Sequence, residues 1–320
     1  MHPLVARIHP GLRTAFFAWF FSRSFLWVVT GPRPLDAATP TPFPALVDTL
    51  LLDMAGAVTS EIATGVLRAL PWVATELLLL VAGVAVYRFA RSTKLPQLAE
   101  RACWLWFFNP VLALTVLDWG AGLAAATGAL ALGAVVTHRP RLAAVAAIVA
   151  VGCRPEFGLL GPAIAIAAWR HHRPDKEGTP TLAAITVAVP LAFSAWIGVA
   201  WHLAGSAGTS LRALHGDGRW RTTSDLIPSI PVEALVVAGL LAAAGLAIRY
   251  LRRVPIWYVL CALPAIAWPL TQVPAQSAAL ALAWSLPTFV HLGMVTDDRS
   301  IERPLIAALV MAFVLAGLTI

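Results

Sequence analysis

The sequence predicts an all-α protein that crosses a membrane about eleven times. The composition, the lengths of the apolar segments and the positions of the basic residues lead to this prediction. Of the 320 residues, 59% are hydrophobic and only 12% are charged, and the mean hydropathy is +0.78. Because a soluble domain carries about 25% charged residues, we expect a polytopic membrane protein without a separate soluble domain.

The apolar segments divide the chain into candidate spans. A helix needs about 20 apolar residues to cross a hydrocarbon layer of ~30 Å, and turn-forming or charged residues separate runs close to this length. We expect spans at 14–30, 71–87, 103–117, 120–136, 142–153, 157–169, 182–203, 232–248, 255–272, 278–295 and 304–320. They form one transmembrane domain, 1–320, with long loops at 31–70 and 204–231.

The basic residues predict the orientation of these spans. With a cytoplasmic N-terminus, sixteen Lys and Arg residues fall in the inner loops and six in the outer ones. Cytoplasmic loops carry an excess of Lys and Arg, so we expect the N-terminus to be cytoplasmic. We expect the membrane to be a bacterial plasma membrane. Both long loops are then outside. The first begins with a Pro-rich turn, and its second half has the apolar spacing of an amphipathic helix at the membrane surface.

The acidic residues cluster on the outer side, although they were not used to assign the orientation. Asp53 and, second, Asp48 are candidates for a general base, because a partly desolvated carboxylate near the membrane surface can accept a proton from a hydroxyl. A solvated face of an amphipathic helix explains them equally well. Asp118, between two apolar runs, is a candidate ligand-binding residue or the N-cap of the helix that follows.

Two arginines are candidates for substrate binding. Arg154 precedes Glu156 at an outer turn, where a guanidinium group can bind phosphate oxygens; pairing with Glu156 is the alternative. Arg23 is a lone charge inside the first span, so it needs a partner or a water-filled cavity. Glu76 in the second span can serve as that partner.

Several function classes have little support. The histidines show no metal-ligand spacing, so no metal site is predicted, and the three cysteines lie in or beside apolar segments without a CxxC pair. The pI of about 10.1 reflects basic residues at the ends of apolar runs rather than a nucleic-acid-binding face. A transporter would show paired broken helices or a polar path through the spans, and the sequence indicates neither.

Several short motifs occur in a characteristic order. They are FFSRSFL at 20–26, LLLDMAG at 50–56, LAERACWLWFFNP at 98–110, CRPEFGLL at 153–160, WHLAGSAGTSLRALHGDGRW at 201–220 and WSLPTFVHLG at 284–293. Together they resemble the GT-C superfamily of membrane glycosyltransferases, most closely bacterial relatives of the GPI mannosyltransferase II (PIG-V-like) family. FFSRSFL is similar to the family's Ser-Arg in the first span, and LLLDMAG to its Trp-Asp-x-Gly acid motif.

The resemblance implies a GT-C-like fold and transfer of a sugar, typically mannose, from a polyprenyl-phosphate donor to a lipid or glycan hydroxyl in the cell envelope. Asp53 would be the base, while Arg154 with Arg219 or Arg221 would steady the departing phosphate. The implied partners are the donor, the acceptor and membrane lipids. No cofactor is implied, and a divalent metal and a membrane protein partner stay open.

A second hypothesis follows from a departure in the acid motif. Leu52 stands where the family has Trp, and the chain is short for the family. The alternative is therefore a catalytically inactive GT-C-like relative that binds lipid or acts as an accessory subunit of a cell-envelope glycosylation complex.

Overall fold

The regular structure is helical wherever the chain is described. The computed structural model describes residues 9–30, 61–91, 99–108, 119–137, 139–153, 160–171 and 179–204, with single positions among 47–56, at 112, 157 and 158, and among 303–318. No strand occurs among these residues. The helices are α1 (Pro10–Thr30), α3 (Glu61–Arg91), α4 (Ala99–Phe107), α6 (Trp119–Val136), α7 (Pro140–Cys153), α8 (Leu160–His171) and α9 (Thr179–Ala204).

Most of these helices coincide with predicted spans. The bounds of α1, α6, α7, α8 and α9 lie within a few residues of the predicted boundaries. Predicted spans 232–248, 255–272 and 278–295, and the predicted loop 204–231 beyond Ala204, lie outside the described residues, and the span 304–320 is described only at isolated helical positions. The described part is therefore helical, as predicted, whereas the total of eleven spans stays a prediction.

Two helices differ from their predicted boundaries. The structure has one continuous helix, α3, where we expected the end of a surface helix and a separate span from residue 71. Pro71 lies inside it, and the exposed apolar residues Ile62, Val66 and Leu70 precede it at helical spacing on one face. In the predicted span 103–117, α4 already ends at Phe107. Pro110 follows, and proline disfavours helical conformation in the residue before it.

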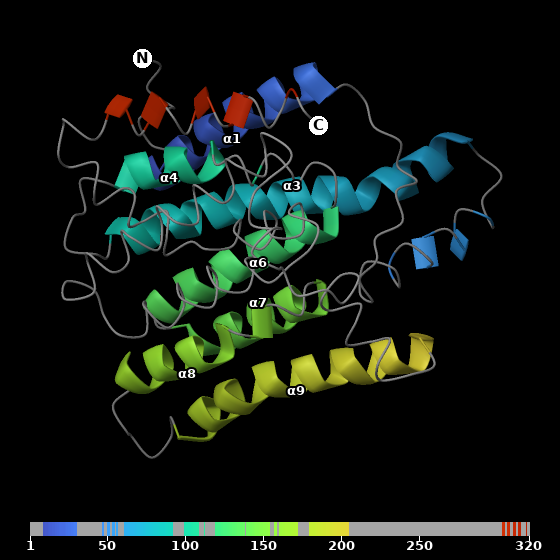
Figure 1. Cartoon of the computed structure of the whole chain (residues 1–320), viewed down its shortest axis with the longest axis vertical. Coiled ribbons are helices and arrows are strands. Elements are labelled where there is room, and N and C mark those ends of the chain that lie inside the picture. The colour runs from blue at the N-terminus through green and yellow to red at the C-terminus, as the bar shows by residue number, and fades with distance from the viewer. Residues whose placement is uncertain are drawn as a thin grey trace, which may run out of the picture.

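The helices lie side by side with similar axis directions, as Figure 1 shows for α1, α3, α6, α7 and α9. The contacts define their directions. Gly11 of α1 faces Tyr87 of α3, Ala15 faces Gly83, and Trp19 bonds Glu76. The α3 number falls as the α1 number rises, so α1 and α3 are antiparallel.

Helix α6 lies in the centre of the described bundle and contacts α3, α7 and α8. It consists largely of Ala and Gly, and it is buried over nearly all of its length. A Cβ atom on Gly133 would lie 2.8 Å from the Cβ of Ala85, and one on Gly128 would overlap the ring of Phe157. Small residues therefore permit the close approach of neighbouring helices at α6.

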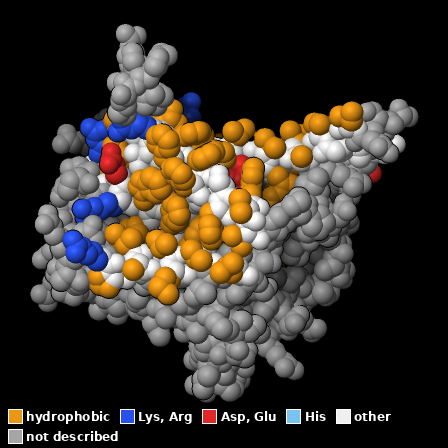
Figure 2. Space-filling view, turned by 90° about the horizontal axis from the view of Figure 1, so that it is seen from above, with side chains coloured by type: hydrophobic (Ala, Val, Ile, Leu, Met, Phe, Trp, Pro, Cys, Tyr) orange, Lys and Arg blue, Asp and Glu red, His pale blue; other side chains and the backbone are white. Residues whose placement is uncertain are grey.

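Exposed basic side chains gather at one end of the bundle. This basic end contains the end of α3, the start of α4 and the turn from α6 to α7. Figure 2 shows Lys and Arg side chains gathered at one edge of the visible face and many hydrophobic side chains on the described surface beside them. The exposed arginines of the basic end are Arg88, Arg91, Arg101, Arg139 and Arg141. All five belong to loops that the sequence predicts on one side of the membrane.

Away from the basic end, much of the exposed surface of the described helices is apolar. Large hydrophobic side chains are exposed on α1, α3, α7 and α9. Among the described helices, the segment Ile62–Arg91 is long and apolar enough to cross a membrane by length and composition. Shorter apolar segments occupy Gly122–Ala134, Arg141–Cys153 and Thr186–Gly198.

Candidate functional site

A buried ion pair joins α1 to α3. Arg23 Nε lies 3.2 Å from Glu76 Oε2, and the two side chains are 4% and 15% exposed. The structure therefore confirms the prediction that Glu76 is the partner of Arg23. Separating the two would be costly, because removing one partner of a buried pair leaves an uncompensated charge and costs about 3–5 kcal/mol.

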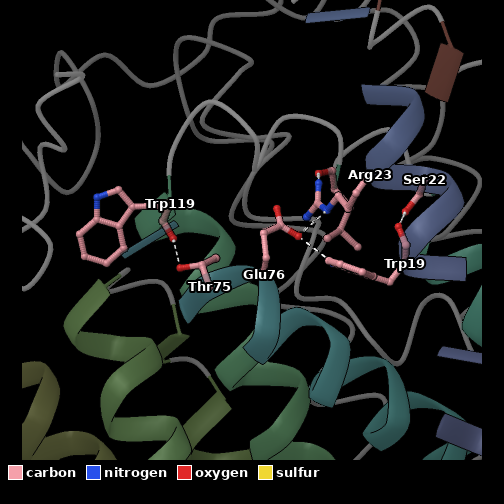
Figure 3. Close-up of polar contacts among 7 residues, drawn as sticks. Trp19, Ser22, Arg23, Thr75, Glu76 and Trp119 are labelled. Atoms are coloured by element: carbon pink, nitrogen blue, oxygen red, sulfur yellow. Dashed lines mark hydrogen bonds and ion pairs between the residues drawn. The ribbon is translucent and has the colours of Figure 1, made fainter. Parts of the chain in front are cut away.

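A tryptophan completes the contact with the carboxylate. Trp19 lies one turn before Arg23 on the same face of α1, and its Nε1 donates a hydrogen bond of 2.8 Å to Glu76 Oε2. Figure 3 shows Trp19 and Arg23 converging on Glu76 from α1. Ser22 turns back to its own helix, where its Oγ donates to the carbonyl oxygen of Trp19 at 3.0 Å. One carboxylate oxygen thus faces two donors from α1.

The arginine also contacts the chain between α4 and α6. Arg23 Nη1 donates a buried hydrogen bond of 3.1 Å to the carbonyl oxygen of Leu112, 89 positions away in the sequence. Beside Glu76 on α3, Thr75 Oγ1 donates to the carbonyl oxygen of Trp119, the first residue of α6, at 3.4 Å. We call Trp19, Arg23, Thr75 and Glu76, with the carbonyl groups of Leu112 and Trp119, the polar cluster.

The polar cluster lies far from the basic end of the bundle. Glu76 is near the middle of α3, about 23 Å along the axis from Arg91. Trp119 begins α6 at the end opposite to its turn with α7. The polar cluster therefore lies between α1 and α3 at the depth in the bundle where α6 begins.

The remaining predicted site residues are described only in part. Asp53 is an exposed residue in helical conformation. Asp48, the second candidate for the base, lies outside the described residues, as do the predicted substrate-binding residues Asp118, Arg154, Glu156, Arg219 and Arg221. Of the predicted set, the structure thus defines the environment of Arg23 in detail.

Described positions flank two of the residues that are not described. Trp119 directly follows Asp118, and Phe157 directly follows Glu156. The Phe157 ring is buried against Gly128 of α6. Both flanking residues therefore belong to the packed core around α6.

Two residues of the polar cluster were not found by sequence reasoning. Trp19 precedes Arg23 by one helical turn, a spacing that brings side chains together and could have indicated it. Thr75 carries no such signal, because a lone threonine in an apolar helix commonly bonds within its own helix. Thr127 does so in α6, where its hydroxyl donates to the carbonyl oxygen of Leu123 at 2.8 Å.

The side chains of the polar cluster join α1, α3 and the chain leading into α6 rather than forming a metal centre. Among the described residues, no group of three or more His, Cys, Asp or Glu side chains could hold a metal ion. The cluster instead offers one guanidinium, one carboxylate, an indole N–H and a hydroxyl, all engaged with one another or with main-chain carbonyls.

No protein-family model, curated protein or solved structure matches this chain.

Proposed function

We propose that this chain is a multi-pass membrane glycosyltransferase of the GT-C type. It would transfer a sugar, typically mannose in the family it resembles, from a polyprenyl-phosphate donor to a lipid or glycan hydroxyl on the outer face. The observation that carries the proposal is the buried Arg23–Glu76 pair. Charged residues inside a membrane are costly and mark functional sites, and Arg23 belongs to the first of the motifs that resemble the family.

The distribution of side chains on α1 supports a membrane location. Its Ser22 and Arg23 are buried, while Phe16, Phe17 and Phe20 are exposed. A surface helix of a soluble protein shows the reverse arrangement. The basic end, with its exposed arginines, would then be cytoplasmic, and the polar cluster would lie toward the outer side.

The proposed reaction needs a base and a group that stabilises the departing phosphate. The acceptor hydroxyl would attack the anomeric carbon, Asp53 or, failing it, Asp48 would take the hydroxyl proton, and the bond to the carrier phosphate would break. Arg154, with Arg219 or Arg221, would stabilise the negative charge on the phosphate. Asp118 and Glu156 would contact the substrate. Arg23, through its ion pair with Glu76, would hold α1 against α3.

Replacement of the proposed base tests this function. In membranes supplied with a polyprenyl-phosphate sugar, Asp53→Asn should lower sugar transfer by about 100-fold or more, the usual contribution of a general base. Glu100→Gln is the matched control, because Glu100 is an exposed acid at the basic end of the bundle. Its transfer rate should equal that of the unmodified chain.

Two results would contradict the proposal in different ways. Transfer at the normal rate by Asp53→Asn would remove Asp53 from its role. The inactive accessory subunit would be favoured by two results together. The unmodified chain would transfer no sugar from any polyprenyl-phosphate donor, and the cell-envelope glycan would be unimpaired after substitution of both Asp48 and Asp53. Leu52, which departs from the acid motif, also favours this alternative.

A further inference from the structure

Two consecutive residues of α3 reach two different points of the chain that leads into α6. Thr75 bonds the carbonyl oxygen of Trp119 directly. Glu76 pairs with Arg23, which in turn bonds the carbonyl oxygen of Leu112. Consecutive helical side chains project about 100° apart, so these neighbours can serve two segments at once. Figure 3 shows Thr75 directed to Trp119 and Glu76 directed to α1.

We infer that Thr75 and Glu76 are positioning residues that fix the start of α6 against α3, Thr75 by its own hydrogen bond and Glu76 through Arg23 and Leu112. Thr75, Arg23, Leu112 and Trp119 are buried, and the side chain of Glu76 is 15% exposed. In such surroundings a hydrogen bond competes little with water and an unmade one is costly. These bonds therefore favour one position of Trp119 along α3.

Apolar contacts between the same helices accompany this hydrogen bond. Farther along, α3 and α6 meet through small residues, where Gly133 lies against Ala85. Contacts of this kind allow close packing but are not directional in the way a hydrogen bond is. A hydrogen bond depends on distance and angle, so the 3.4 Å contact from Thr75 Oγ1 to the carbonyl oxygen of Trp119 adds a directional preference to the Ala and Gly contacts.

The consequence for catalysis rests on the proposed function. Asp118, a proposed substrate-binding residue, directly precedes Trp119 in the chain. Thr75 and Glu76 would therefore act on donor binding through the start of α6 without touching the donor. Their loss should raise the donor KM while leaving kcat nearly unchanged, which distinguishes positioning of a binding residue from a general loss of folded enzyme.

Hydrogen exchange of the full chain in detergent tests the inference without any activity assay. Thr75→Val keeps the side-chain shape and removes the hydroxyl. Amides in the first two turns of α6 should exchange faster by up to about fivefold, the upper bound set by the loss of one ordinary hydrogen bond. Thr127→Val is the matched control, because Thr127 is equally buried in α6 but bonds its own helix. Equal exchange in the two variants would overturn the role of Thr75.

A double substitution tests Glu76 without leaving a buried charge. In Arg23→Gln with Glu76→Gln, the amides can still bond each other, but the shorter Gln side chain cannot span the distance that Arg23 spans to Leu112. The same α6 amides should exchange at least about tenfold faster, since hydrogen bonds from charged donors are about twice as strong as neutral ones. Unchanged exchange in this folded variant would overturn the role of Glu76.

Kinetics then separate this inference from the proposed function. If the unmodified chain transfers sugar, Thr75→Val should raise the donor KM at near-constant kcat, and an equal loss of kcat would overturn the link to donor binding. If the unmodified chain transfers no sugar, the proposed function fails, whereas faster exchange in Thr75→Val than in Thr127→Val would still support the positioning of α6.

Discussion

Helices α1 and α6 are both apolar and both bury alanines, but among the described residues α1 also buries a charged side chain whereas α6 does not. Helix α6 lies at the centre and presents Ala and Gly to its neighbours on all sides. Helix α1 lies at the edge, with a row of exposed phenylalanines on one side and Ser22 and Arg23 buried on the other. The phenylalanines also stack on one another along the helix, as Phe16 does on Phe20 and Phe17 on Phe21.

This difference shows which physical effect shapes each helix. For α6, close packing dominates, because the helix is buried over nearly all of its length and its small residues make the closest contacts. For α1, the polar atoms dominate, because Arg23 needs Glu76 and Trp19 while the outward side needs no polar group at all. An edge helix with its polar side inward suits a hydrocarbon environment better than water.

The largest expected effect comes from removing the carboxylate that pairs with Arg23 on the buried side of α1. Glu76→Leu leaves the Arg23 guanidinium without its carboxylate, so the free energy of unfolding should fall by about 3–5 kcal/mol. Thermal unfolding of the detergent-solubilised chain measures this loss. The double variant Arg23→Met with Glu76→Leu should recover most of it, since it removes both charges. An unchanged melting temperature in Glu76→Leu would show that the pair does not stabilise the bundle.

A substitution on the exposed side of α1 tests whether that side faces lipid. Phe20 is near the middle of α1 and is 46% exposed. In a bilayer, Phe20→Lys should impair insertion by about 2.5–3.5 kcal/mol, the cost of a charge at the centre of a span. The inserted fraction in membranes measures it, with Phe20→Leu as an apolar control. If Phe20 faced water, Lys would be harmless, and equal insertion of both variants would refute the lipid-facing side.

A smaller effect is expected from filling space at the centre of α6. Gly128→Ala places a methyl group where the ring of buried Phe157 lies. Overpacking of this kind costs about 1–3 kcal/mol, so the melting temperature should fall. Gly198→Ala in α9 is the control, because no atom lies within 4 Å of the added methyl group. There, the better helix propensity of Ala should leave stability equal or slightly higher. Equal behaviour of the two variants would show that α6 is not tightly packed.

Much of the helix order could be predicted because apolar length and charge position are local properties of the sequence. The run 120–136 is bounded by Asp118 and by Arg139, and the structure ends α6 at Val136. The continuity of α3 could not be predicted, since Pro71 indicates a boundary when its neighbours are unknown. Only the packing context shows that the helix continues through it.

The site was predictable where a charge had to find a partner. Arg23 and Glu76 are ionisable residues inside expected spans, so elementary electrostatics suggested their pairing before the fold was known. The bonds from Arg23 to Leu112 and from Thr75 to Trp119 were not predictable, because main-chain carbonyls are present at every residue and carry no sequence signal. The roles of Asp53, Arg154 and the other proposed site residues stay predictions.

The length of α3 has a consequence for the bilayer itself. Its 31 residues rise about 46 Å, whereas the 18 residues of α6 rise about 27 Å, and hydrocarbon is ~30 Å thick. Trp119 lies level with Thr75, about 21 Å along α3 from Glu61. In a membrane, the long and short helices would create opposite hydrophobic mismatch side by side. Because α6 is enclosed by α3, α7 and α8, the short helix would lie inside the bundle, the polar cluster would lie near the outer boundary of the hydrocarbon, and the Glu61 end of α3 would project beyond it.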